Sequence, residues 1–277
     1  MPILIISPIR KQKTDHGEMH VEQMNETLKG RHLVFVIGED EYASEITMPR
    51  IAKEAEHKHG AQVTVLSAHP GPAEPANIPG LEALQTADLA VFYLRFRQLP
   101  EEQFGYIRAY LEAGKPVIGL RTSTHSFDYP EGHPLARWND GFGTDVLGAP
   151  WIRHFGHSSS TDVSIAWGAN EHPILRGVPT HFSCRSWLYQ VLPYPPEGAL
   201  LLLNGHTVNP EDNGWSYTED TPRVQPVAWT RTHFGGGRVL TTTMGHPEDF
   251  EQPAFRRLLL NGIHWAVGAE HWISEGE

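Results

Sequence analysis

The feature that most constrains this chain is a regular alternation of short apolar runs with amphipathic segments, which begins near residue 31. The run at 33–37 (LVFVI) is apolar at every position, which is typical of a strand covered on both faces. Similar runs predict strands at 63–66, 88–94 and 116–120. Because short connections with one helix each join these strands, we expect right-handed crossovers and a parallel sheet.

Amphipathic segments between these runs predict helices. The first begins near Ser44 or Thr47, either of which can cap its N-terminus, and Gly60 ends it. Pro49 is tolerated there because it falls in the first turn. Apolar residues at helical spacing predict further helices at 81–86, 100–114 and 253–268.

The middle of the chain, 122–226, differs from both flanks. It is rich in Gly, Pro, Trp and His, and only 162–167 and 199–204 have strand character. Beyond it, apolar runs at 227–234 and 238–244 enclose three glycines and predict a β-hairpin. We therefore expect an α/β fold: a doubly wound, mostly parallel sheet flanked by helices, with long middle loops and a C-terminal β-hairpin.

The same pattern predicts the domain organisation. Residues 31–270 form a single domain, which follows an N-terminal extension, 1–30, and precedes a short tail, 271–277. Connections as long as those of the middle region are usually functional when they occur in a compact domain.

Composition excludes several classes of function. The chain has 22 Lys and Arg against 33 Asp and Glu, a net charge of −11, which argues against a nucleic-acid partner. The one cysteine, Cys184, excludes an intrachain disulfide and a thiolate metal cluster, so any metal would bind to His, Asp or Glu. The apolar stretches are far shorter than the roughly 20 residues of a membrane span, and the first residues lack the order of a secretory signal. We expect a cytoplasmic protein without a membrane partner. The sequence leaves open whether the protein forms a homo-oligomer.

A ligand of an open parallel sheet binds beside the carboxyl ends of the strands, where the strand order reverses. Four polar loops follow predicted strands and are the candidates: 39–42, 95–97, 121–127 and 245–249. Arg95 and Arg97 point the same way if their strand continues, because side chains alternate with a period of two. With Arg121 they would form a cationic cluster, which either pairs with acidic residues of 39–41 or awaits an anionic or polyhydroxylated ligand.

The segment 119–123 has the strand-then-turn context in which hydrolases and amidotransferases display a nucleophile. Its central position holds Arg121, and a guanidinium neither acts as a nucleophile nor releases its proton. Ser123 lacks the flanking glycine of such a turn, and nothing around Cys184 marks it as reactive. We therefore expect this turn to direct a cation.

Several motifs resemble those of the trehalose-utilisation (ThuA-like) family. They are GKPVIGL (114–120), THSF (124–127), GFG (141–143) with His154, HPI (172–174), LY (188–189) and, toward the C-terminus, GGRVL (236–240), MGHP (244–247), PAFRR (253–257) and GIHWAVG (262–268). The resemblance covers 31–270 and is most specific in its C-terminal part. It implies a class I glutamine amidotransferase-like (flavodoxin-like) fold and a role in the bacterial catabolism of disaccharides or their keto forms.

Two places depart from the family pattern. Members commonly have a histidine where this chain has Arg121, and an acidic pair where it has Ser186 and Trp187. The residues nonetheless suit a sugar, because Arg, Asp and His make directional hydrogen bonds to hydroxyl groups. Apolar faces for a pyranose ring come from Trp138, Trp151, Trp187 and Tyr189.

We predict an enzyme that acts on a disaccharide, glycoside or keto-sugar derivative by acid–base chemistry. His125 and His246 are the proton-transfer candidates because imidazole titrates near neutral pH, and Asp40 is an orienting or basic carboxylate. The candidate substrate-binding residues are Glu39, Tyr42, Arg95, Arg97, Arg121, Thr122, Ser123, Trp138, Asp140, His154, His157, Trp187 and Tyr189.

Two other functions stay open. His154 and His157, with His246 or Asp140, are enough ligands for a catalytic zinc, which would make the protein a zinc-dependent hydrolase. The exchange to Arg121 also fits a sugar-binding or sensing domain without catalysis. The expected ligand is a small sugar; no cofactor is expected, and a divalent metal is left open.

Overall fold

The computed structural model describes residues 10–11, 21–22, 25–210 and 220–275, so most of the predicted N-terminal extension, 1–30, and the end of the tail lie outside the described residues. The described chain forms one nine-stranded sheet and a separate pair, β1 (Arg10–Lys11) with β2 (Val21–Glu22). The strands of the large sheet are β3 (His32–Gly38), β4 (Gln62–Ser67), β5 (Leu89–Leu94), β6 (Val117–Leu120), β7 (Ser160–Ile165), β8 (His181–Cys184), β9 (Leu200–Val208), β10 (Val224–Thr232) and β11 (Arg238–Thr242).

The large sheet has the order β4-β3-β5-β6-β11-β10-β9-β7-β8. Neighbouring strands are parallel from β4 to β11 and antiparallel from β11 to β8. The structure therefore confirms a mixed α/β fold and the C-terminal hairpin of β10 and β11. The antiparallel part is larger than the sequence predicted, because the hairpin reverses the strand direction and the middle region adds β9, β7 and the unpredicted β8 beyond it.

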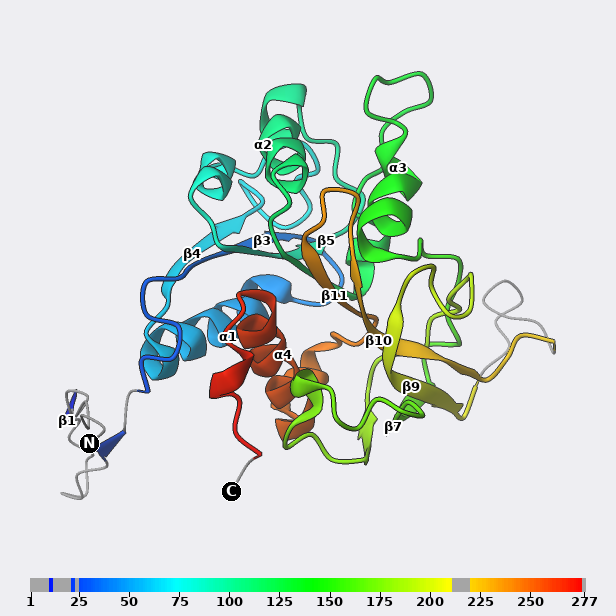
Figure 1. The fold of residues 1–277 in the computed structure, drawn as a ribbon. Helices are drawn as coiled ribbons and strands as arrows, with labels where there is room; N and C mark the ends of the chain where they lie inside the picture. Colours follow the sequence, from blue (N-terminus) through cyan, green and yellow to red (C-terminus); the bar gives the residue numbers. More distant parts are fainter. Residues whose placement is uncertain (1–9, 12–20, 23–24, 211–219, 276–277) are drawn as a thin grey trace.

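Helices cover both faces of the sheet (Figure 1). α1 (Ser44–His59) and α4 (Pro253–Ala266) lie against one face, whereas α2 (Glu101–Glu112), α3 (Trp138–Gly141) and the short helix η1 (Leu81–Gln85) lie on the other. The helices predicted from periodicity all form. Five more short helices are η2 (Arg121–His125), η3 (Phe142–Leu147), η4 (Pro173–Leu175), η5 (Pro247–Glu251) and η6 (Glu270–Trp272). No helix of the described ranges is both long and apolar enough to cross a membrane.

Alternate side chains of β3 enter two different hydrophobic cores. Leu33 and Phe35 join the core beneath α1 and α4, and Val34 and Val36 join the core on the α2 side. Both faces of the strand are therefore buried, which is why its sequence is apolar without alternation.

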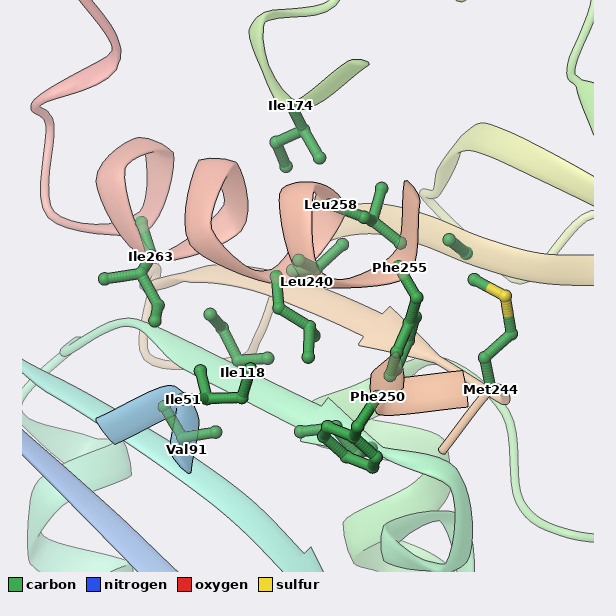
Figure 2. Close-up of a cluster of buried hydrophobic side chains, with 14 of the residues drawn as sticks. Ile51, Val91, Ile118, Ile174, Leu240, Met244, Phe250, Phe255, Leu258 and Ile263 are labelled. Atoms are coloured by element: carbon green, nitrogen blue, oxygen red, sulfur yellow. The ribbon is translucent and has the colours of Figure 1, made fainter. Parts of the chain in front are cut away.

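The core beneath α4 joins the helix to the centre of the sheet. Figure 2 shows Leu258 and Phe255 of α4 facing Leu240 of β11 and Ile118 of β6. A Cβ at Gly262 would collide with a terminal methyl of Leu240, so a larger residue here would force the Leu240 side chain to move. Each large side chain buried here stabilises the fold by roughly 1.5–3 kcal/mol.

The strand order places the sequence-predicted loops at one edge of the sheet. The chain leaves β3 through α1 toward β4 and returns on the opposite side to β5, so the order reverses between β3 and β5. Gly38 and Leu94 end these two strands as paired residues, and Leu120 and Thr242 do the same in β6 and β11. The loops that follow these four parallel strands therefore start at a common edge, where a ligand site is expected.

Candidate functional site

Arg121 is the first residue after β6 and has a left-handed backbone, with φ of +43°. This conformation is costly for a residue with a side chain, and strain of this kind is common at functional turns. η2 begins at the same residue, so the strand-to-helix turn that the sequence indicated does form. Its central position carries a guanidinium that is fully buried.

Oxygen atoms and aromatic rings hold the guanidinium of Arg121. Nη1 donates to the carbonyl of Thr243 at 2.9 Å and to that of Trp187 at 3.4 Å, and Nη2 donates to Tyr42 Oη at 3.1 Å. Nε has no hydrogen-bond partner within the described part of the chain. The rings of Tyr42, Tyr189 and Trp187 lie 4.3, 4.8 and 5.4 Å from the guanidinium carbon. A desolvated cation–π contact contributes about 2 kcal/mol, so this aromatic box offsets part of the cost of burying the charge.

Imidazole rings surround this aromatic box. The ring of Trp187 lies 4.2 Å from that of His157 and 5.2 Å from that of His154. It lies 6.4 Å from the ring of His246, and the ring of His125 lies 6.3 Å from that of Tyr189. We call the following set the Arg121 cluster: Tyr42, Arg121, His125, Trp151, His154, His157, Trp187, Tyr189 and His246.

Hydrogen bonds assign the ring protons of the two predicted proton-transfer residues. His246 Nδ1 accepts from the backbone N–H of Glu248 at 3.3 Å, so the proton of the neutral ring lies on Nε2. Thr124 Oγ1 donates to the carbonyl of Arg121, which leaves it to accept from His125 Nδ1 at 3.3 Å. The neutral rings therefore differ, since His246 presents a donor at Nε2 and His125 presents an acceptor there.

Burial and positive charge keep these imidazoles neutral. Burial lowers the pKa of His125 well below its ordinary value of 6.5, and the charges of Arg95 and Arg121 lower it further. Burial is also the main cause that lowers the pKa of His154 and of His246, and Arg121 adds to the effect at both. A neutral imidazole can accept a proton at one nitrogen and donate one at the other, as acid–base chemistry requires.

Glu39 acts at the start of α1. Its buried carboxylate accepts backbone N–H groups of Glu41 and Tyr42, both at 2.7 Å, and of Ser44 at 2.8 Å. This acidic side chain therefore does the capping that the sequence assigned to Ser44 or Thr47, neither of which makes a side-chain cap. The capped turn holds Tyr42 beneath Arg121.

Asp40 and Glu41 pair with Arg95 beside the Arg121 cluster. Asp40 lies 3.1 Å from Arg95 Nη1, and Glu41 lies 3.1 Å from its Nε. All three side chains are partly exposed, so the pairs add little stability. They do place two carboxylates and a cation within reach of solvent.

Arg97 lies apart from the cluster, contrary to the expectation that it follows Arg95. β5 ends before these residues, and Phe96 has a left-handed φ of +51°, so the alternation of side chains does not continue. The buried guanidinium of Arg97 donates instead to the carbonyls of Pro72, Glu74 and Arg95. Its contacts hold loops together.

Thr122 and Ser123 are fully buried in η2, below the surface of the site. Ser123 Oγ accepts from the backbone N–H of Leu94 at 3.1 Å and donates to the carbonyl of Phe92 at 2.8 Å. Ser123 therefore fastens η2 to β5 and does not present its hydroxyl to a ligand.

Trp138 and Asp140 lie on α3. The ring of Trp138 is buried in the core on the α2 side, 5.1 Å from the ring of Phe104, and Asp140 is exposed on the same turn. The ring of Trp138 packs instead against Phe104, Phe234 and Arg137, none of which belongs to the Arg121 cluster.

Two residues that were not among the predicted site residues, Asp249 and Ser186, hold the loop of His246. Oδ2 of the buried Asp249 accepts from the backbone N–H groups of Gly245 at 3.0 Å and His246 at 3.1 Å. The same oxygen accepts the hydroxyl of Ser186 at 2.5 Å. The one signal available was the spacing of His246 and Asp249, which matches a capping box.

Within the described residues, no group of three His, Cys, Asp or Glu side chains is placed to hold a metal ion. The rings of His154 and His157 are stacked with centroids 5.1 Å apart, and His154 Nδ1 contacts the carbonyl of Phe155 at 2.6 Å. Cys184 is buried, and burial raises its thiol pKa well above the ordinary value, so it is not a reactive thiolate at neutral pH.

Known proteins resemble this chain both in sequence family and in fold. The sequence profile of the ThuA family, described as trehalose utilisation, matches residues 21–266. A comparison with curated proteins gives no match. Among solved structures, a ThuA-like protein from Parabacteroides merdae ATCC 43184 has a TM-score of 0.60 at 14% identity, over 86% of this chain and 90% of that chain.

Two further structures have a TM-score of 0.47. One is a cytoplasmic protein from Salmonella typhimurium LT2, at 13% identity over 85% of this chain and 99% of that chain. The other is a cold-adapted β-galactosidase from Rahnella sp. R3, at 14% identity over 86% of this chain and 32% of that chain.

The family match extends from β2 to the end of α4 and includes every loop that contributes to the Arg121 cluster. The family implies a role in sugar metabolism, in the broad sense of trehalose utilisation. The chain belongs to the ThuA family.

Proposed function

We propose that this protein is an enzyme that acts on a disaccharide, glycoside or keto-sugar derivative by acid–base chemistry at the Arg121 cluster. The observation that carries the proposal is that the Arg121 cluster contains two neutral imidazoles with opposite roles at Nε2, His125 as an acceptor and His246 as a donor. The family supports the sugar, since its description is trehalose utilisation.

In the proposed mechanism, His125 Nε2 takes a proton from a sugar hydroxyl or from a carbon next to a carbonyl. The electron pair of the broken O–H or C–H bond moves toward the carbonyl oxygen, or forms a double bond as the C–O bond of the glycosidic oxygen breaks. The oxygen that gains the negative charge takes the proton of His246 Nε2–H. Asp40, which is partly exposed and paired with Arg95, orients a hydroxyl group. Arg121 does not contact the substrate in this scheme. Its charge lowers the pKa of both imidazoles and so helps to keep them neutral, and the aromatic box holds Arg121 in place.

We further propose that the fold is the flavodoxin-like, class I glutamine amidotransferase-like type. The strand order β4-β3-β5-β6 supports it, because β3 lies between the two strands that follow it in the chain. Helices on both faces of this parallel part also support a doubly wound arrangement.

Mass spectrometry of reactions with trehalose, other glycosides and their 3-keto forms tests the function. We expect His125→Ala and His246→Ala to lower turnover by about 10²- to 10⁴-fold while the thermal unfolding midpoint stays close to that of the wild type. His181→Ala, at an exposed histidine of β8, is the matched control and should keep full turnover. Full activity of both cluster variants would contradict the assignment.

A sugar-binding or sensing domain without catalysis is the second candidate. The observation that favours it is Arg121 itself, which puts an unreactive group at the tip of the turn after β6. For this candidate we expect the same sugars to raise the unfolding midpoint without forming any product. Turnover of any sugar in the panel would eliminate it.

A further inference from the structure

We propose that Phe96 and Trp151, whose rings both pack against the imidazole of His125, form a stacking surface for a neutral pyranose ring. This inference rests on the proposed function, because it identifies the part of a sugar that the site recognises. Phe96 lies in the candidate loop 95–97, but the sequence singled out only the two arginines of that loop.

The two aromatic rings lie at similar distances and angles from the ring of His125. Their centroids lie 5.0 Å from the imidazole for Phe96 and 5.2 Å for Trp151, at interplanar angles of 49° and 51°. The backbone N–H of Phe96 donates to the carbonyl of His125 at 3.0 Å, and that of Trp151 donates to the carbonyl of Thr124 at 3.2 Å. Three segments that are far apart in sequence are therefore tied into one surface.

Neither aromatic ring serves the hydrophobic cores. Phe96 and Trp151 belong to none of the three buried clusters of the described chain, and 37% of Phe96 is exposed. Phe96 also has a left-handed φ of +51°, which a bulky residue adopts at a cost of about 1–3 kcal/mol. A strained, exposed phenylalanine that packs against a predicted catalytic imidazole indicates a contact with a ligand.

The surrounding charges favour a neutral partner. Arg95 lies over the Phe96 ring, 4.6 Å from its centroid, and is paired with Asp40 and Glu41. A pyranose has apolar C–H faces and a rim of hydroxyl groups, so its face can pack on aromatic rings while the rim meets His125 Nε2 and Asp40. The two carboxylates would repel an anionic sugar. The charge of Arg95 would not offset this repulsion, because it is already paired with them.

Binding measurements with three defined probes test this surface. The probes are methyl α-D-glucopyranoside, trehalose and D-glucitol, an open-chain polyol that has hydroxyl groups but no ring face. Calorimetry gives the Kd, and saturation-transfer NMR shows which sugar C–H protons contact the protein. We expect Phe96→Ala and Trp151→Ala each to weaken binding of the two cyclic probes at least tenfold, and Phe96→Tyr to retain it.

Two controls separate stacking from structural support. Phe234→Ala removes another exposed phenylalanine, 55% exposed in the turn between β10 and β11, and should leave Kd unchanged. Phe96→Gly removes the ring and also relieves the left-handed strain, so we expect it to weaken sugar binding without lowering the unfolding midpoint.

The outcomes distinguish this inference from the proposed function. Wild-type affinity in Phe96→Ala and Trp151→Ala, or equal affinity for D-glucitol and the methyl glucoside, would overturn the stacking surface alone. Failure of the wild-type protein to bind or convert any cyclic sugar would overturn both proposals. Tenfold weaker binding in the folded variants, together with weaker saturation transfer to the sugar C–H protons, supports the surface.

Discussion

The hydroxyl of Ser186 donates to the buried carboxylate of Asp249 at 2.5 Å, and the same oxygen accepts the backbone N–H of His246. The same pair of residue types also meets on the surface, where Ser183 donates to Asp162 at 2.6 Å. The geometry is alike, but only the buried carboxylate orients a residue of the Arg121 cluster. When a buried carboxylate loses its charge, several donors lose their acceptor. The donors around an exposed carboxylate can bind water instead.

The first prediction concerns this carboxylate. Asp249→Asn replaces one acceptor with a donor that faces backbone N–H groups, so we expect the free energy of unfolding to fall by about 1–3 kcal/mol or more. Sugar turnover should fall as well, because the turn of His246 loses its support. Urea unfolding followed by circular dichroism measures the first effect. The matched surface variant Asp162→Asn should stay within about 0.5 kcal/mol of the wild type; equal losses in the two variants would refute the role of Asp249.

The second prediction concerns the charge of Arg121. Arg121→Met keeps a long side chain but removes a cation that lowers the pKa of His125, His154 and His246. Each of these pKa values should therefore rise, and the fall in turnover on acidification should begin at a higher pH. Imidazole NMR titration follows the individual rings. Arg238→Met, at the far end of β11 from Arg121, is the control and should leave all three titrations unchanged, because the Arg238 charge contributes to none of the three pKa shifts.

The third prediction concerns Gly245, which precedes His246 and has φ of +150°. A Cβ there would lie 2.9 Å from Tyr93 Oη and 3.2 Å from Arg121 Cβ, so Gly245→Ala must displace the turn. We expect at least a tenfold loss of turnover and a lower unfolding midpoint. Gly236→Ala is also at a left-handed glycine, but a Cβ there meets nothing within 4 Å, so its turnover should match the wild type. Equal turnover in the two alanine variants would contradict the prediction that the turn requires glycine at residue 245.

The fourth prediction concerns acid stability and a second pair of histidines. Thr27 Oγ1 bridges His59 Nδ1 and His264 Nε2, each at 2.9 Å. Burial, with a smaller contribution from His264, lowers the pKa of His59 to about 4. Since the unfolded chain binds this proton near the ordinary value of 6.5, the folded state loses stability as the pH falls from there toward 4.

Unfolding midpoints measured between pH 7 and pH 4 check this effect. His59→Gln should show a smaller fall in midpoint on acidification than the wild type, because one of the contributing groups is gone. His57→Gln, at an exposed neighbour on α1, should follow the wild-type curve. Identical pH dependence in the wild type and the His59 variant would contradict the prediction.

The sequence could predict the structural elements because their signals are local. The unbroken apolar run of β3 requires cover on both faces, and Gly60 marks the end of α1 with a left-handed φ of +75°. The turn at Arg121 was also visible, since a strand followed by a sharp turn is a local pattern. The edge of the sheet where the candidate site lies follows from the strand order, which short connections largely dictate.

The tertiary structure decided which residues belong to the candidate site. Arg95 and Arg97 have the same side chain and nearly the same position in sequence, yet a left-handed residue between them sends one to the site and the other to backbone carbonyls. Trp138 was as good a candidate as Trp187 until the packing of α3 buried it in the other core. Sequence determined which segments could form strands, helices and turns, because those choices depend on neighbours along the chain. Only the tertiary structure decided which side chains meet, because burial, charge pairing and contact depend on neighbours in space.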